Sequence, residues 1–211
     1  MARLQKGILD DISGKVGKVI GSKWRGVTYI RSIGTKRSKN LSPEQEEQQA
    51  KFKIATSFTQ SMHDLFELGF RDQAIRMTGT NYAQSLILKE AITGNYPDFK
   101  IDYSKVPVSK GRLPKAKTPA VAPDATGIIK FTWTSNAGVR LAKANDQAIL
   151  AAYCPELNEC NFLINSTREA GTATLDVSEF SGKVVHTWIS FMSANGKLLA
   201  PSIYTGEVTV T

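Results

Sequence analysis

Residues 7–33 read GILDDISGKVGKVIGSKWRGVTYIRSI, and the interpretation of the whole chain starts from this basic, glycine-rich stretch. Its segment 27–31, VTYIR, is β-branched and aromatic, which suits a pleated strand. The glycines at 14, 21 and 26 supply turns or bulges, because glycine adopts positive φ without strain. We predict a β-hairpin or small meander. Short strands interrupted by glycine bury little core alone, so we expect this ribbon to pack on the following helices or on a neighbouring subunit.

Positive charge is concentrated in the same region. Residues 1–40 hold ten Lys or Arg against two acids, a formal charge of +8 that equals the net charge of the chain. Residues 101–120 carry a further +4, while 41–100 and 121–211 are each −2. A local basic surplus attracts phosphate backbones, anionic membranes or acidic protein faces, although lysines also protect exposed sheet edges from aggregation. The candidate partner-binding residues are Lys15, Lys18, Lys23, Trp24, Arg25 and Arg31.

Length and composition limit the number of domains and the class of protein. A chain of 211 residues accommodates one large domain or two small ones, and its 41% hydrophobic and 22% charged residues are ordinary for a globular protein. It has no apolar run of about 18 residues that could span a membrane. The first residues, MARLQKGILDD, lack the apolar core of a secretory signal, so we expect cytoplasmic synthesis, with incorporation into a particle as a further destination. Cys154 and Cys160 give no disulfide framework, and we expect free thiols.

Helical patterns follow the ribbon. Ser42 can cap a helix that starts at Pro43, and apolar residues then recur at three- and four-residue steps, which predicts a helix over about 43–68. A short helix is predicted over 71–77 and another over about 81–93. The alternation from Phe99 to Tyr103 indicates a half-buried strand. Residues 1–108 are therefore expected to form an α+β domain, a β-hairpin or meander with two or three helices.

The second half has the pattern of an all-β domain. Residues 109–124, SKGRLPKAKTPAVAPD, have the composition of a semi-rigid Pro/Lys-rich linker, and we place the domain boundary there. Residues 125–211 contain six or seven short alternating strands and an Asn195-Gly196 hairpin signal. This spacing predicts an immunoglobulin-like or fibronectin-like β-sandwich with Trp133 and Tyr204 in its core.

No catalytic or metal-binding motif is apparent. His63 and His186 are the only histidines, and neither has another potential ligand at the spacing that metal sites show in sequence. GxSxG and phosphate-loop motifs are absent, since Gly14-Lys15 lacks the required spacing. We predict a protein without enzymatic activity, cofactor or metal. Stacking of Trp133 and Trp188 on sugars is a weaker alternative to their burial in the core.

Four segments of the chain resemble an uncharacterised family, a domain of unknown function found in Bacteroidota-type bacteria and their phages. They are GILDDISGKVGKVIGSKWRGVTYIRS, SPEQEEQQAKFKIA, AITGNYPDFKIDYSKVPVSKG and WISFMSANGKLLAPSIYTG. The resemblance covers nearly the whole chain and implies no activity, catalytic residue or cofactor. Its association with phages favours a virion or prophage-like component.

Two functional hypotheses remain. The first is a non-enzymatic structural or interaction protein that joins a multimeric assembly through the basic ribbon, with protein partners and self-association. The second is a sequence-independent nucleic-acid-binding protein whose ribbon contacts phosphates, so that its affinity falls steeply with salt. No helix-turn-helix or zinc-finger pattern supports the second hypothesis.

Overall fold

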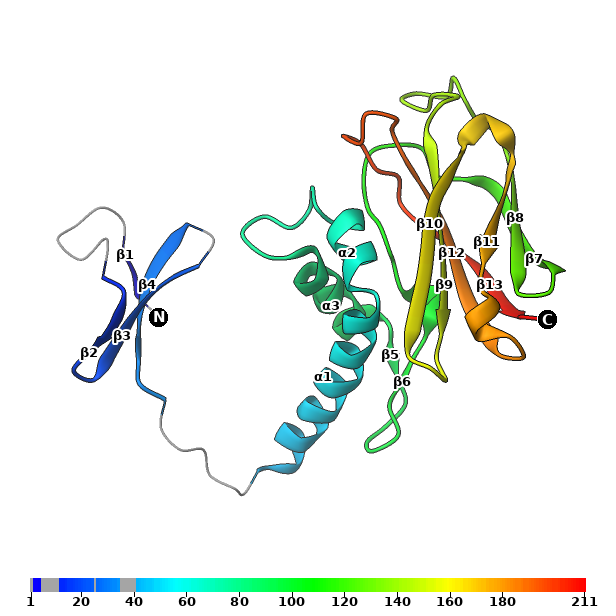
Figure 1. The fold of residues 1–211 in the computed structure, drawn as a ribbon. Coiled ribbons are helices and arrows are strands. Elements are labelled where there is room, and N and C mark those ends of the chain that lie inside the picture. Colours follow the sequence, from blue (N-terminus) through cyan, green and yellow to red (C-terminus); the bar gives the residue numbers. More distant parts are fainter. Residues whose placement is uncertain (1, 5–11, 25, 35–40) are drawn as a thin grey trace. The chain divides into compact units, whose positions relative to one another are not determined.

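The chain divides into two compact units, unit 1 (Met1–Pro43) and unit 2 (Glu44–Thr211) (Figure 1). The computed structural model describes residues 2–4, 12–24, 26–34 and 41–211. This division differs from the one expected from the sequence, because the helices belong to the same compact unit as the sandwich and the boundary falls after Pro43. Each unit is described by itself.

Unit 1 is a small antiparallel sheet with the strand order β1-β4-β3-β2. The predicted meander is therefore present, with a two-residue Gly17-Lys18 turn between β2 and β3 in which Gly17 has a φ of 58°. Positive φ at this turn is the reason that glycine is required there. The strands are β1 (Ala2–Leu4), β2 (Gly14–Val16), β3 (Val19–Trp24) and β4 (Val27–Ser32).

Three helices begin unit 2. The predicted helix over 43–68 is two helices, because the backbone leaves helical geometry at Met62, where φ is −108° and ψ is 20°. The apolar stripe runs through this break, so the periodicity did not reveal it. The predicted helix over 71–77 is a turn region, and the helix predicted over 81–93 starts two residues earlier, capped by Thr78. The helices are α1 (Pro43–Ser61), α2 (His63–Gly69) and α3 (Gly79–Glu90).

The predicted β-sandwich is present, with seven strands in two antiparallel sheets. One sheet has the order β11-β8-β7 and the other β10-β9-β12-β13. Strand β10, the fourth of the sandwich, pairs with β9 and so belongs to the four-stranded sheet. In the antibody constant-type arrangement the fourth strand belongs to the other sheet, so the two arrangements differ. The strands are β7 (Lys117–Ala125), β8 (Ile128–Thr134), β9 (Gln147–Cys154), β10 (Glu159–Thr167), β11 (Thr172–Asp176), β12 (Val184–Met192) and β13 (Ile203–Thr209).

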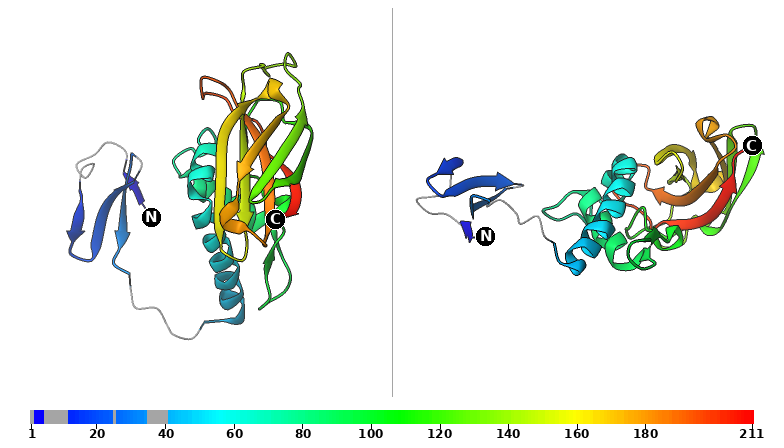
Figure 2. Two further views of the ribbon diagram at one scale, coloured as in Figure 1. Left: turned by 45° about the vertical axis from the view of Figure 1, so that its right-hand side comes forward. Right: turned by 90° about the horizontal axis from the view of Figure 1, so that it is seen from below.

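The helices cover the outer face of the four-stranded sheet, which makes unit 2 a three-layer structure (Figure 2). Strand β9 shows why. Its residues alternate between two cores, with Leu150 among the side chains between the sheets and Tyr153 among those under the helices. A strand buried on both faces reads as a continuous apolar run. Phe58 of α1 packs edge-on against Tyr153, with ring centroids 4.8 Å apart, so the helices are joined to the sandwich by core contacts.

A strap over residues 102–113 continues this core past a two-stranded ribbon, β5 (Ile92–Thr93) and β6 (Lys100–Ile101). The expected linker over 109–124 is not a free connector. Ser109 donates to Ser190 Oγ at 2.7 Å, the Leu113 amide donates to the Leu199 carbonyl at 2.9 Å, and the second half of the segment is strand β7. Trp188 Nε1 donates to the Val106 carbonyl at 3.0 Å. Hydrogen bonds to distant residues therefore hold a segment whose composition resembles that of a linker.

Both cysteines are free, and they lie on opposite faces of one sheet. Cys154 packs between the two sheets, whereas Cys160 packs under the helices. Cys154 pairs in register with Glu159, so the two cysteines are not directly opposite each other. Burial raises the pKa of the Cys160 thiol to about 12.

Candidate functional site: the basic sheet of unit 1

The strand register of unit 1 assigns each described side chain to one of two faces. Directly paired residues share a face and successive residues alternate. One face, here called the Tyr29 face, carries three rows across the sheet. They are Lys15–Ile20–Arg31, Ser22–Tyr29 and Trp24–Val27. The rows are about 7 Å apart, two residues along a strand.

The opposite face, here called the Val19 face, is partly closed. Gly21 and Thr28 on this face are buried, and a Cβ at Gly21 would collide with the backbone and side chain of Ile12. Ile12 therefore lies against this face, and only glycine fits beneath it. Val16 and Val19 lie at its margin and are exposed, Val16 by 57%.

No residue on the three rows of the Tyr29 face is buried. Trp24 is 47% exposed, Lys15 and Arg31 are exposed, and Tyr29 is half-buried. Among the side chains that the structure describes, the face thus combines two aromatic rings with two cations. Aromatic residues and arginine are enriched at protein interfaces, and the same combination also serves base stacking.

The structure brings together only some of the residues predicted from the sequence. Lys15, Trp24 and Arg31 share the Tyr29 face. Lys23 pairs with Thr28 and lies on the Val19 face, and Lys18 is in the hairpin turn. The prediction for Arg25 falls outside the described residues. Tyr29 and Ile20 also lie on this face, although they were not among the predicted partner-binding residues. Alternation along β4 places Tyr29 with Arg31, whereas Ile20 could be placed only from the strand register.

The two units differ in net charge. Residues 1–43 contain ten bases and two acids and carry the whole net charge of +8, while residues 44–211 contain seventeen of each. Unit 1 is therefore a strongly cationic body, and unit 2 is balanced overall. A cationic sheet of this kind favours acidic partners and speeds their encounter.

The two histidines occupy structural positions. Nδ1 of His63 lies 2.9 Å from the hydroxyl of Thr80, and Glu67 accepts the Thr80 amide at 3.0 Å, so this group ties α2 to the start of α3. Nδ1 of His186 lies 2.8 Å from the Tyr204 hydroxyl. Burial lowers the pKa of His186, with Glu207 opposing this effect. Among the residues that the structure describes, no cluster of three or more His, Cys, Asp or Glu could hold a metal ion.

The two tryptophans of the sandwich are closed to ligands. Trp188 is fully buried and Trp133 is 6% exposed, so neither can stack on a sugar. Tyr204, which we predicted in the sandwich core, lies partly buried against the helical core instead.

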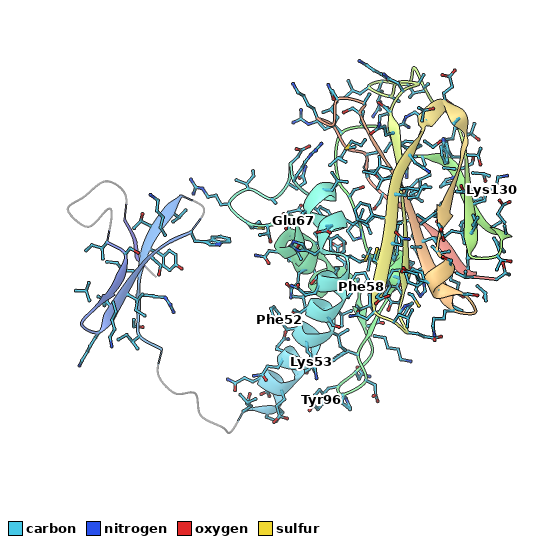
Figure 3. The ribbon with its side chains drawn as sticks, in the orientation of Figure 1. Phe52, Lys53, Phe58, Glu67, Tyr96 and Lys130 are labelled. Atoms are coloured by element: carbon cyan, nitrogen blue, oxygen red, sulfur yellow. The ribbon has the colours of Figure 1, made fainter. Side chains whose placement is uncertain are left out.

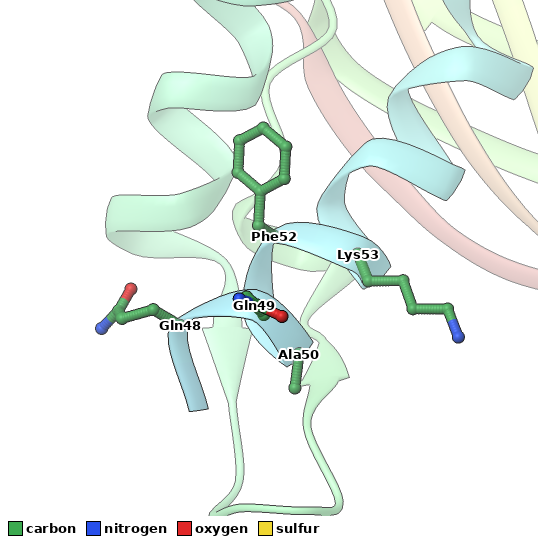
Figure 4. A pocket seen from close by; sticks show the side chains of 5 residues that line it. All are labelled: Gln48, Gln49, Ala50, Phe52 and Lys53. Carbon is green, nitrogen blue, oxygen red and sulfur yellow. The ribbon is translucent and has the colours of Figure 1, made fainter. Parts of the chain in front are cut away.

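Helix α1 presents one further exposed aromatic ring. Phe58 lies on the side of α1 that meets the sheet, whereas Phe52 is 55% exposed (Figure 3). Phe52 lines a shallow surface pocket together with Gln48, Gln49, Ala50 and Lys53, all from α1 (Figure 4). One helix forms the described lining, and nothing in it selects a ligand. None of the helices in the described part of the chain has the length and apolar character needed to cross a bilayer.

These features define a class of protein, a two-unit chain with a basic β-sheet and a helix-covered β-sandwich. The chain belongs to the Family of unknown function (DUF6266), whose model matches residues 11–206 and so includes parts of both units. No curated protein matches it.

Two solved structures are similar to part of the chain. The crystal structure of the chicken CNTN1 FN1–FN3 domains is 11% identical over 49% of this chain and 35% of that one, with a TM-score of 0.39. The solution structure of the fn3 domain of the human collagen alpha-1(XX) chain is 17% identical over 48% of this chain and 89% of that one, with a TM-score of 0.34. This chain thus matches about a third of the CNTN1 fragment.

Proposed function

We propose that this chain is a non-enzymatic interaction protein that joins a multimeric assembly, such as a phage or phage-like particle, by docking through the Tyr29 face of unit 1. The observation that carries the proposal is this face, on which Trp24 and the two cations Lys15 and Arg31 are exposed, with Tyr29 on the row between them. Exposed aromatic and apolar side chains bordered by charge are typical of protein interaction surfaces.

The positive charge of unit 1 indicates which kind of partner the Tyr29 face binds. Two copies of unit 1 would repel each other, so contact between two Tyr29 faces is disfavoured. The partner surface is instead an acidic face of a neighbouring subunit, including another copy of this chain. Such head-to-tail contacts produce rings when the rotation closes and filaments when it does not. The match of one family model to parts of both units supports a joint role for them.

Nucleic-acid binding is the second candidate, and the same face favours it. Tyr29 lies on the row between Trp24 and the Lys15–Arg31 row, so two rings and two cations follow one another along the face, as stacking rings and phosphate contacts would. Binding of that kind is independent of sequence and weakens with salt. Unlike protein docking, it would leave nucleic acid bound to the purified protein, and the sample would then absorb strongly at 260 nm.

Light scattering during size exclusion at about 50 mM and about 500 mM salt tests the proposal. We expect a discrete oligomer with a protein spectrum, which the double variant Trp24→Ser/Arg31→Glu reduces to a monomer. The matched control, Val16→Ser/Lys23→Glu, makes the same charge change on the other face and should leave the mass unchanged. A wild-type monomer at both salts would refute the self-associating form of the proposal, and bound nucleic acid shed at high salt would favour the second candidate.

A further inference from the structure

A groove at one end of the sandwich carries a second, separate inference. Two segments form its walls, residues 111–117 leading into β7 and residues 135–140 following β8, and Pro201 closes one side. Its volume is about 810 Å³, which is the size of a typical ligand site. All of these residues belong to unit 2.

A buried arginine holds the two walls together. Arg168 is fully buried, its Nη2 donates to the Pro114 carbonyl at 3.1 Å, and its Nη1 donates to Asn136 Oδ1 at 2.6 Å. Asn136 Nδ2 in turn donates to the Lys115 carbonyl at 3.0 Å. Each wall is thus bonded both to the same guanidinium and to the other wall. The groove is preorganised, which lowers the entropic cost of binding.

The rim of the groove is cationic. Arg112, Lys115, Lys117 and Arg140 line it, all four are exposed, and no carboxylate is among the lining residues that the structure describes. Within residues 41–211, none of the four is within ion-pair distance of an acid. Because unit 2 has equal numbers of acids and bases, this is a local concentration of positive charge. A concave site of one sign focuses the field on ligands of the other sign.

The rest of the lining selects among anionic ligands. Leu113 is buried, Val139 is 52% exposed, and Pro114 and Pro201 are partly exposed, so aliphatic surface lies between the cations. No aromatic side chain is among the described residues that line the groove. Stacking platforms for bases need aromatic rings, so nucleic acid is a poor fit. Carboxylates interspersed with aliphatic side chains match both parts of the surface.

The backbone provides a further sign of a specialised site. Thr118, next to the groove, has a φ of 46°, and Arg140 in the groove has a φ of 53°. Positive φ is uncommon outside glycine and an outlier for a β-branched residue, and such strain clusters at functional sites. We propose that this groove binds an extended acidic segment of a partner protein, with its carboxylates on Arg112, Lys115, Lys117 and Arg140.

Fluorescence anisotropy with the full-length protein tests the proposal. The probe is a fluorescein-labelled decapeptide of alternating Glu and Leu, and a labelled (dT)10 oligonucleotide, which carries more negative charge than the peptide, is the comparison. The groove variant is Lys115→Glu/Arg140→Glu. The ribbon variant Lys15→Glu/Lys18→Glu accounts for binding to unit 1, and Lys53→Glu/Lys89→Glu on α1 and α3 is the matched control for net charge. All six positions are exposed, so each protein should keep its circular dichroism and melting temperature.

We expect the groove variant to weaken peptide binding at least about tenfold, while the charge control stays within about threefold of the wild type. The ribbon variant reports the peptide bound at unit 1 and should weaken binding less than the groove variant does. The groove variant should change (dT)10 binding much less than peptide binding. The proposal is overturned if the wild type does not bind the peptide, or if the control loses as much affinity as the groove variant. It is also overturned if the ribbon variant accounts for the loss, or if (dT)10 and the peptide lose affinity equally in the groove variant.

Discussion

Replacing Arg168 with methionine should destabilise unit 2 severely. Arg168 Nε donates to Asp146 Oδ2 at 3.0 Å, with both side chains at most 1% exposed. Its guanidinium also lies 3.9 Å from the ring centroid of Phe191. Burial lowers the pKa of Arg168 and Asp146 opposes this effect, but arginine stays protonated. The pair is therefore a buried ion pair with further hydrogen bonds, and it stabilises the fold only while both partners are present.

The magnitude follows from what Asp146 keeps. After Arg168→Met its Oδ2 retains one donor, the Lys143 amide at 2.9 Å, and its Oδ1 has no hydrogen-bond partner. Removing one partner of a buried pair costs about 3–5 kcal/mol. The cation–π contact adds about 1 kcal/mol. We therefore expect a loss of about 4–6 kcal/mol in the free energy of unfolding, roughly 10 °C or more in melting temperature.

Urea unfolding followed by tryptophan fluorescence measures this loss, because Trp133 Nε1 donates to the Arg168 carbonyl at 2.9 Å. The control is Lys183→Met, which breaks the exposed ion pair of Lys183 with Glu156 at 2.7 Å and should change stability little, because exposed ion pairs are screened by solvent. The double variant Arg168→Met/Asp146→Ala removes the orphaned charge and should recover part of the stability. A loss for Arg168→Met no larger than that for Lys183→Met would refute the reasoning.

Three further predictions concern the fold and its pH dependence. Gly111→Ala should destabilise the fold by about 2 kcal/mol or more, because the added Cβ would lie 2.6 Å from the carbonyl carbon of Leu199. Gly34→Ala, where the space around the glycine is open, should change stability by less than about 0.5 kcal/mol, and thermal melts compare the two variants. Because the pKa of His186 is lowered in the folded protein, the unfolded chain takes up a proton at a higher pH than the folded one does. The free energy of unfolding should therefore fall as pH drops below about 6.5, and His186→Gln should reduce this fall in urea titrations at pH 7.5 and 5.5. Acrylamide should quench the 47% exposed Trp24 and little else, and Trp24→Phe should abolish the quenchable fraction; unchanged quenching would contradict the exposed face.

The sequence predicted the local elements well because their signals are local. The alternation expected over residues 125–211 is present in β8, where Ile129, Phe131 and Trp133 share the buried face, and the cap at Ser42-Pro43 placed the start of α1 correctly. Strands were predicted over residues 125–211, but the burial of β9 on both of its faces was not predicted. The helices cover that second face, and their attachment to the sandwich was missed because the second buried face was not predicted.

Other features depend on contacts between residues far apart in the chain. Residues 109–124 have linker composition, yet Ser109 bonds to Ser190 and Leu113 to Leu199. Arg140 joins Arg112 at one groove only after the sheets form. Composition cannot report such pairings. Similarly, the basic residues of unit 1 were identified from the sequence, but their division between two faces required the strand register.

A photo-crosslinker in place of Trp24 tests the central claim most directly. Purified full-length protein with benzoylphenylalanine at position 24 would be irradiated at about 50 mM salt and its crosslinked peptides sequenced by mass spectrometry, with the same group at position 16 as the control. The account predicts crosslinks from position 24 to an acidic surface of a second copy, which are weak or absent from position 16. Crosslinks that stay within one chain, or that are equally strong from both positions, would contradict docking through the Tyr29 face.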